Sequence, residues 1–344
     1  MQVLKDGRSK IQVSELISLL PLLTDLARSV IEKDSKLIAK TVLNETKIAL
    51  HGSLGDEIDV LLNSAFVKRG FDFADYDLAI IKEDHSELRN ALTIRDSSGQ
   101  LLLRSFVDSK FYIAIDRSWN AIYFLNREKG IGGVWSLDYS KISLSSYITP
   151  LRALFSWCVD DRGCELIHAA GIRIAGKGIA LSGDSGSGKS TLAICAAASG
   201  CEILGDDAIL VSGNDMYGIY TKAKIDLKSP FVDLDSLRAQ YLSESWSTKA
   251  ILNLDSEIFS LVSELPLDVF VLPVIGSGVS YSKLSKATVV KEFIPQTMKE
   301  LLGGTTNNAK NLFQLVSSKP FYRLELGPIM EDNLKALYEI ASMV

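Results

Sequence analysis

One run of residues has the types and spacing of a phosphate-binding loop. Residues 183–190 read Gly-Asp-Ser-Gly-Ser-Gly-Lys-Ser, which fits G-x-x-x-x-G-K-[S/T] at every specified position. Glycines let successive backbone N–H groups turn inward around a phosphate without a Cβ in the way. Lys189 would reach the β- and γ-phosphates of a nucleotide, and the Ser190 hydroxyl would be a ligand for Mg²⁺.

The surroundings of this phosphate loop agree with the motif. An apolar strand enters it, and an Ala- and Leu-rich helix follows whose N-terminal N–H groups would point at the same anion. A glycine-rich turn ahead of an alanine-rich helix is the alternative interpretation. The residues assigned to nucleotide binding are Gly183, Asp184, Ser185, Gly186, Ser187, Gly188, Lys189, Ser190 and Thr191.

Two adjacent carboxylates, Asp206 and Asp207, come at the end of the next predicted strand. Asp is depleted in strands. Beside a phosphate loop, one of the two could hold Mg²⁺ and the other could accept a proton from an attacking hydroxyl. A solvated Gly-Asp-Asp turn is the alternative. His168 lies in an apolar segment before the loop, where a lone histidine is more often a core residue, and His51 and His85 lie in polar segments.

The elements that must position these residues read as a strand, loop, helix and strand. Such a βαβ unit implies a partly parallel sheet and an α/β fold. The pattern predicts a hairpin over 170–175 and 179–182, a helix over 190–199 ended by Gly200, and strands over 202–204 and 208–211.

The first half of the chain has a different pattern. Apolar spacing over 14–33 predicts one or two amphipathic helices, with Pro21 starting the second or kinking the first. Short apolar runs predict an antiparallel meander of about five strands, followed by a glycine-rich break at 129–133 and a helix near 150–159. The predicted strands are 77–82, 91–95, 101–107, 111–115 and 121–125. We place a domain boundary near 148, with an α+β accessory domain over 1–148 and an α/β domain over 149–344.

The composition of the chain argues against several classes of function. The chain has 344 residues, 47% of them hydrophobic, and 37 basic against 42 acidic side chains for a net charge of −5. This well-mixed charge disfavours nucleic-acid binding by a broad basic surface. Four cysteines without a C-x-x-C pair make a zinc site improbable and indicate a reducing compartment. With no signal-peptide pattern and no stretch near ~18 apolar residues, we expect a cytoplasmic protein without membrane contact.

Residues 166–212 resemble the core of the HPr kinase/phosphorylase family. The shared features are the order of His168, a strand hairpin, the phosphate loop, a helix and Asp206-Asp207. The resemblance implies the P-loop fold that this family has in common with phosphoenolpyruvate carboxykinases. It also implies that Asp206 is the general base toward a serine hydroxyl, supported by His168. We assign Asp207 and Ser190 as the ligands of Mg²⁺, directly or through water.

The chain departs from that family at two places. The signature Glu-Ile-Arg-Gly-Leu-Gly does not follow Asp207, and Thr191 stands where an acidic residue is usual. Phosphorylation of HPr itself and the reverse phosphorolysis are therefore not implied. Residues 224–230 are similar to a basic strand of related proteins, which makes Lys228 a candidate substrate contact, and 321–326 are similar to their late strand.

These observations together predict a kinase that uses ATP and Mg²⁺ and transfers the γ-phosphate to a hydroxyl. The acceptor would be a serine of a protein or peptide, or a small hydroxylated metabolite. A non-catalytic nucleotide-sensing module and a plain ATPase are the alternatives. The Asp206, Asp207 and His168 set argues against the sensor, which needs no proton acceptor. The choice between ATP and GTP, and a homo-oligomeric state, are left open.

Overall fold

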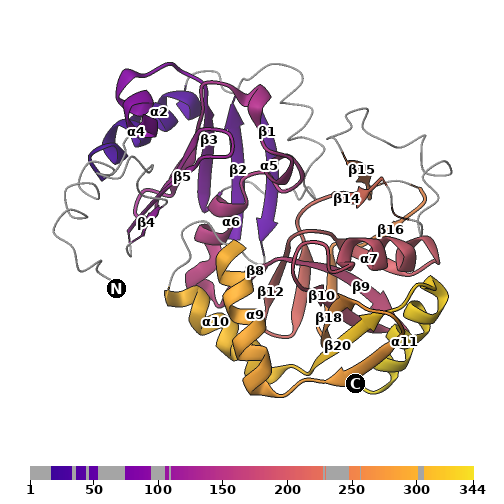
Figure 1. Ribbon diagram of the computed structural model, residues 1–344. Helices are drawn as coiled ribbons and strands as arrows, with labels where there is room; N and C mark the ends of the chain where they lie inside the picture. Colours follow the sequence, from indigo (N-terminus) through magenta and orange to yellow (C-terminus); the bar gives the residue numbers. More distant parts are fainter. Residues whose placement is uncertain are drawn as a thin grey trace. The chain divides into compact units, whose positions relative to one another are not determined.

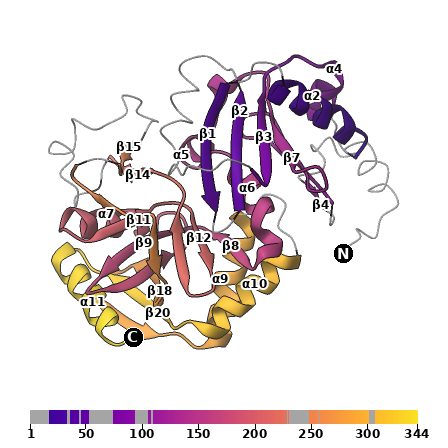
Figure 2. The same ribbon diagram turned by 180° about the vertical axis from the view of Figure 1, so that it is seen from behind.

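The computed structural model describes residues 17–32, 36–43, 46–52, 74–93, 105–107, 110–227, 229, 248–255, 257–300 and 306–344. They belong to two compact units, each with its own sheets and core (Figures 1 and 2). Of the described residues, the first unit contains those up to Asp160 together with Thr306, and the second contains those within Asp161–Glu300 and Asn307–Val344. No helix within the described ranges has both the length and the apolar character to span a membrane.

The first unit is built on a seven-stranded sheet of order β1-β2-β3-β7-β6-β5-β4. Strands β2, β3 and β7 run parallel to one another, and the other neighbours are antiparallel. The bounds are β1 Lys36–Leu43, β2 Thr46–Gly52, β3 Tyr76–Ile81, β4 Ser105–Val107, β5 Phe111–Asp116, β6 Ala121–Asn126 and β7 Ile131–Trp135.

Helices α2 (Leu20–Glu32) and α4 (Ser86–Thr93) place buried side chains in one core cluster with residues of β3, β5, β6 and β7. Pro21 lies in the first turn of α2, where its missing N–H costs no intrahelical bond. Three short elements complete the unit: a 3₁₀ turn at Tyr139–Lys141, α5 at Leu144–Ile148 and α6 at Arg152–Val159.

The first unit continues past the boundary near 148 that the sequence suggested. Asp160 is buried at the end of α6, accepts a hydrogen bond from the Tyr112 hydroxyl at 2.9 Å and pairs with Arg127 at 3.1 Å. Both partners belong to strands of the first sheet or the turn that follows them. This buried contact ties α6 to that sheet.

Part of the strand prediction for this unit is wrong. Residues 91–93 belong to α4, because Leu88 and Ala91 are three residues apart and both face the core as on one side of a helix. Strand β3 is not part of an antiparallel meander, since it pairs in parallel with β2 and β7. Residues 94–95 and 101–104 lie outside the described ranges.

The glycine-rich stretch at 129–133 is also not a break. Gly132 and Gly133 lie within β7, and a Cβ on Gly133 would come 2.3 Å from the carbonyl oxygen of Ala79 on β3. The glycine there serves a close approach of two strands.

The second unit contains a seven-stranded sheet of order β16-β11-β9-β10-β18-β20-β19. Strands β10, β18 and β20 are parallel neighbours, whereas β9 is antiparallel to both β10 and β11. The predicted hairpin and the partly parallel sheet are therefore present. The bounds are β9 Ala169–Ile174, β10 Lys177–Ser182, β11 Glu202–Gly205, β16 Ser260–Leu261, β18 Val269–Ile275, β19 Ser280–Lys283 and β20 Phe321–Leu326.

A smaller sheet of order β17-β13-β12-β8 and the antiparallel pair β14-β15 complete the strands described for this unit. Their bounds are β8 Cys164–Ile167, β12 Ile209–Ser212, β13 Asp215–Gly218, β14 Lys222–Asp226, β15 Lys249–Asn253 and β17 Glu264–Pro266. The helices are α7 Lys189–Ala198, α9 Lys286–Glu300, α10 Thr306–Ser318 and α11 Met330–Ser342, and a 3₁₀ turn covers Asp160–Arg162.

Alternate residues of the central strands face two different cores. On β18, Val269 and Val271 pack in the cluster that holds the buried faces of α7 and α11. Phe270 and Leu272 point the other way, into the cluster that holds the faces of α9 and α10. The large sheet thus lies between two helical layers (Figure 1), as the period of two in a strand requires.

The stability of this layer arrangement can be tested at Phe270. Its ring stacks on Phe321 with centroids 4.5 Å apart and contacts Phe293 at 5.2 Å. Phe270→Ala should lower the free energy of unfolding of this unit by about 3–5 kcal/mol, because it removes a buried ring and leaves a cavity. Urea denaturation measures the loss. Phe313→Ala, which removes a half-exposed ring on α10, should change it by no more than ~0.5 kcal/mol, and equal losses would contradict the packing described.

Candidate functional site

The carboxyl ends of the parallel strands β10, β18 and β20 meet at one edge of the large sheet. The phosphate loop follows β10, Gly276 follows β18 and Gly327 follows β20. A cavity of about 540 Å³ opens there, and residues of all three connections line it. In open α/β sheets this edge is the usual place for a ligand.

The phosphate loop has the backbone that its glycines allow. Gly186 and Gly188 have φ values of 84° and 97°, in the left-handed region that side chains disfavour. Gly188 is the N-cap of α7, and because glycine has no side chain it offers the first N–H groups of the helix no capping hydrogen bond. The first N–H groups of α7 therefore start at the cavity, where an anion can accept hydrogen bonds from them.

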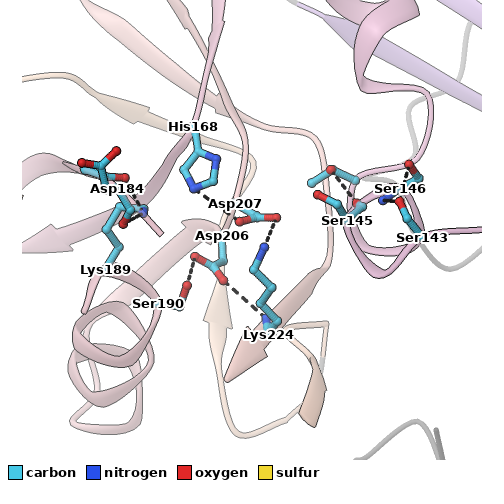
Figure 3. A network of polar contacts seen from close by, with 12 residues as sticks. Ser143, Ser145, Ser146, His168, Asp184, Lys189, Ser190, Asp206, Asp207 and Lys224 are labelled. Atoms are coloured by element: carbon cyan, nitrogen blue, oxygen red, sulfur yellow. Dashed lines mark hydrogen bonds and ion pairs between the residues drawn. The ribbon is translucent and has the colours of Figure 1, made fainter. Parts of the chain in front are cut away.

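The ammonium group of Lys189 is held across the loop. Lys189 is only 5% exposed, and its Nζ donates to the carbonyl oxygens of Gly183 at 2.6 Å and Asp184 at 3.0 Å (Figure 3). In the same loop the Ser187 hydroxyl is buried without a hydrogen-bond partner in the part of the chain that the structure describes. A preformed positive charge and a buried orphan hydroxyl fit a phosphate-binding loop.

The two carboxylates after β11 face different partners (Figure 3). Asp206 is fully buried, and its carboxylate accepts hydrogen bonds from Ser190 Oγ at 3.0 Å and from the backbone N–H of Lys224 at 3.4 Å. Asp207 pairs with Lys224 Nζ at 2.7 Å and lies 3.6 Å from His168 Nε2. His168, Asp207 and Lys224 line the cavity, and Asp206 is not among its lining residues.

Backbone geometry separates these neighbours. Asp207 has a φ of 68°, a left-handed conformation that is uncommon for a residue with a side chain, although Asp tolerates it better than most. Such strain tends to occur at functional sites. At this turn of the backbone, Asp206 contacts the first turn of α7, whereas Asp207 faces the cavity.

Burial raises the pKa of Asp206 above its ordinary value, and the negative charge of Asp207 raises it further. Lys224, the Ser190 hydroxyl and Lys189 act in the opposite direction. The charged form of the Asp206 carboxylate is thus disfavoured, chiefly by burial, and a cation next to it would favour that form.

The residues present fit a Mg²⁺ ion. Mg²⁺ prefers oxygen ligands and is usually held by one or two carboxylates together with substrate phosphates and water. The Ser190 hydroxyl and the Asp206 carboxylate are oxygen donors already in contact beside the phosphate loop. Within the described ranges no three His, Cys, Asp or Glu side chains gather into a metal cage.

Most residues predicted from the sequence come together in this structure. His168, Ser185, Gly186, Gly188, Lys189, Ser190, Thr191 and Asp207 line the cavity. Gly183, Asp184 and Ser187 form the loop behind that lining, and Asp206 lies against Ser190. Lys228 lies outside the described residues.

The sequence pointed to the segments 224–230 and 321–326 by resemblance, but it did not assign to the site the residues that reach the cavity from these and other distant elements. Lys224 and Asp226 come from β14, and Lys249 of β15 donates to Asp226 at 3.3 Å. Ile275, Leu326, Met330 and Asn333 come from β18, β20 and α11. A strand followed by glycine, at Ile275-Gly276 and Leu326-Gly327, is the signal that could have pointed to two of them.

Comparison with known proteins finds similarity among solved structures only. No protein-family model matches the chain, and no curated protein matches it. Among solved structures, the HPr(Ser) kinase/phosphatase from Coxiella burnetii is similar at 11% identity and a TM-score of 0.27, over 51% of this chain and 93% of that one. At this identity and TM-score the match says nothing about what this chain does.

The electrostatics of Asp206 predict how stability depends on pH. Because the folded-state pKa is raised, the folded chain binds this proton more tightly than the unfolded chain, whose Asp titrates near ~4. The free energy of unfolding should therefore fall as pH rises from that value through the raised pKa. Asp206→Asn lacks this loss, so its melting temperature relative to wild type should increase as pH rises from ~4 toward neutrality.

Thermal unfolding in EDTA without nucleotide measures this difference. Asp332→Asn, which removes an exposed carboxylate on α11, is the matched control and should follow wild type across the range. A gap between Asp206→Asn and wild type that stays constant with pH would contradict the buried carboxylate described here.

Proposed function

We propose that the second unit binds a nucleoside triphosphate with Mg²⁺ and transfers the γ-phosphate to a hydroxyl group. The observation that carries this proposal is the carboxylate of Asp207, which lines the same cavity as the phosphate loop and lies between His168 and Lys224. A buried anionic proton acceptor beside a phosphate-binding loop is the arrangement that phosphoryl transfer to an alcohol requires.

In this proposal the phosphate loop binds the triphosphate. The N–H groups of the loop and of the first turn of α7 would donate to phosphate oxygens. Lys189 would exchange its bonds to the Gly183 and Asp184 carbonyls for charge-assisted bonds to the β- and γ-phosphates. The proposal keeps the fold and the cofactor predicted from the sequence, which are a kinase-type P-loop domain and ATP.

Ser190 and Asp206 would hold the Mg²⁺ ion, whose charge neutralises the β- and γ-phosphate oxygens when it is bound. Their existing hydrogen bond keeps the hydroxyl next to the carboxylate at the start of α7.

Asp207 would accept the proton of the acceptor hydroxyl. The acceptor oxygen forms a bond to the γ-phosphorus, the bond from that phosphorus to the β–γ bridging oxygen breaks, and the nucleoside diphosphate leaves. His168 and Lys224 would hold the Asp207 carboxylate in place, and Lys224 adds a positive charge next to the transferred group.

This division of roles differs from the one expected from the sequence, in which Asp206 is the base and Asp207 a metal ligand. Asp206 has no exposed surface, does not line the cavity and is bonded to Ser190, so an acceptor hydroxyl in the cavity meets Asp207 instead.

The acceptor remains the class predicted from the sequence, a serine of a protein or peptide or a small hydroxylated molecule. A plain ATPase would use water in place of that hydroxyl. A nucleotide sensor would need the phosphate loop but not the contacts of Asp207 with His168 and Lys224.

Nucleotide binding should depend on Lys189. Lys189→Ala removes charge-assisted contacts worth about 1.5–3 kcal/mol, so the affinity for Mg·ATP should fall by about tenfold or more. Isothermal titration calorimetry measures the affinity. Lys335→Ala, at an exposed position of α11 that does not line the cavity, is the control and should bind as wild type does. Unchanged affinity in Lys189→Ala would contradict the binding role of the loop.

Phosphoryl transfer should depend on the two carboxylates in different ways. Asp207→Asn keeps the side chain's size but loses its proton-accepting charge, so transfer at saturating ATP should fall by roughly 10²–10⁴-fold while ATP affinity changes little. Asp206→Asn should instead raise the Mg²⁺ concentration needed for half-maximal transfer.

The assay follows label from γ-radiolabelled ATP into products in an extract of the source cells. Transfer by Asp207→Asn at the wild-type rate would exclude Asp207 as the base. Release of labelled inorganic phosphate alone would identify an ATPase, and no release by any form would favour the sensor.

A further inference from the structure

The cavity has a second end whose chemistry differs from that of the phosphate end. Its residues follow β18 and β20 or begin α11, and we call them the apolar end: Ile275, Gly276, Leu326, Gly327, Pro328, Met330 and Asn333. No member of this set carries a charge, whereas the phosphate end contains Lys189, Asp207 and Lys224. A ligand that fills the cavity must therefore be highly charged at one end and apolar at the other.

The apolar end adjoins the phosphate loop directly. A Cβ on Gly188 would lie 2.5 Å from Leu326 Cδ1 and 3.4 Å from Ile275 Cδ1. These two residues are register partners at the carboxyl ends of the neighbouring strands β20 and β18. A group attached to a phosphate in the loop has only to cross the edge of these two strands to reach the apolar end.

Large apolar surface is left exposed at this end. Ile275 is 67% exposed, Met330 at the first position of α11 is partly exposed, and Leu326 forms the floor at 5% exposure. An aromatic ring laid against these side chains would bury apolar area on both partners.

The one polar side chain of the apolar end, Asn333, is hydrogen-bonded to the protein backbone. The amide oxygen of Asn333 accepts a hydrogen bond from the Gly327 N–H at 2.9 Å, and its amide nitrogen donates to the Gly327 carbonyl at 3.0 Å. Asn333 is only 1% exposed. It therefore fixes the Gly327-Pro328 segment as a rigid wall and has little surface with which to read a ligand.

We infer that the apolar end binds the nucleobase of the triphosphate against Ile275 and Met330, by ring contact and without hydrogen-bond readout from a side chain. This inference rests on the proposed function. Sites built to hydrogen-bond a substrate group reject analogues that lack it by 10⁴–10⁵, but apolar pockets separate close analogues by only ~10–200-fold. Adenine and guanine differ at polar edge groups, so the site accepts both purine nucleotides.

The test compares Mg²⁺ complexes of ATP, GTP, CTP and inorganic tripolyphosphate by isothermal titration calorimetry on the full chain. The affinities for ATP and GTP should lie within about fivefold of each other, and both should exceed the affinity for tripolyphosphate by about tenfold or more. The affinity for CTP should lie between those of the purine nucleotides and of tripolyphosphate, because its ring is smaller. The double variant Ile275→Ala/Met330→Ala should weaken ATP and GTP by about tenfold and leave tripolyphosphate unchanged. Ile329→Ala, exposed in the same segment but not lining the cavity, should match wild type.

Each contrary outcome has a separate meaning. Equal affinities for ATP and tripolyphosphate, or an unaltered ATP affinity in the double variant, would overturn the base site while the phosphate loop stands. A preference for ATP over GTP of a thousandfold or more would overturn recognition by ring contact alone. Failure of both ATP and tripolyphosphate to bind would overturn the proposed function and the base site with it.

Discussion

Two neighbouring carboxylates are buried together after β11, where they contact the first turn of α7 and strand β14. A carboxylate out of water disfavours its charged form, and a second negative charge next to it increases that effect. Asp206 shows both influences in its raised pKa. Lys224, Ser190 and Lys189 offset the repulsion without removing it. The folded chain thus keeps a buried carboxylate whose charged form is disfavoured and which a bound cation would stabilise; groups with such perturbed pKa values tend to occur at functional sites.

The fold of the second unit places these carboxylates beside a single cavity. Three parallel strands end at the same edge, so the phosphate loop, the Ile275-Gly276 turn and the Leu326-Gly327 turn open into one cavity. Helical layers on both faces of the sheet bury its central strands and leave their ends as the accessible part. Charge gathers on the side of β11 and β14, and apolar surface on the side of β18 and β20. That polarity is what a nucleoside triphosphate presents.

Local patterns predicted the parts of the site that are local in sequence. The phosphate loop, the hairpin before it and α7 depend on glycine spacing, strand alternation and a helix start within a few residues of one another. Ile275 and Leu326 reach the same cavity through strand order, and Asn333 reaches it from α11. The glycine after each of the two strands is the one local signal for this arrangement, and it does not show which strands are neighbours. Asp206 is buried against Ser190 whereas Asp207 lines the cavity, and side-chain types alone cannot predict this difference between adjacent carboxylates.

In the first unit, too, local sequence patterns predict some elements correctly and fail at others. Its strands over 111–116 and 121–126 follow from apolar runs, but 91–93 is helical because Leu88 and Ala91 pack on one core. Gly132 and Gly133 resemble a break in the sequence, yet the parallel neighbour β3 leaves no room for a Cβ at Gly133. In both places a tertiary contact decides the local structure.

The most direct measurement is a crystal structure of the chain with Mg²⁺ and a non-hydrolysable ATP analogue. The account predicts the triphosphate in residues 183–191 with Lys189 on its β- and γ-phosphates, and Mg²⁺ on Ser190 and Asp206. It also predicts the γ-phosphate facing Asp207 and the base against Ile275 and Met330. A nucleotide bound elsewhere on the chain, or a cavity that stays empty at saturating nucleotide, would contradict it.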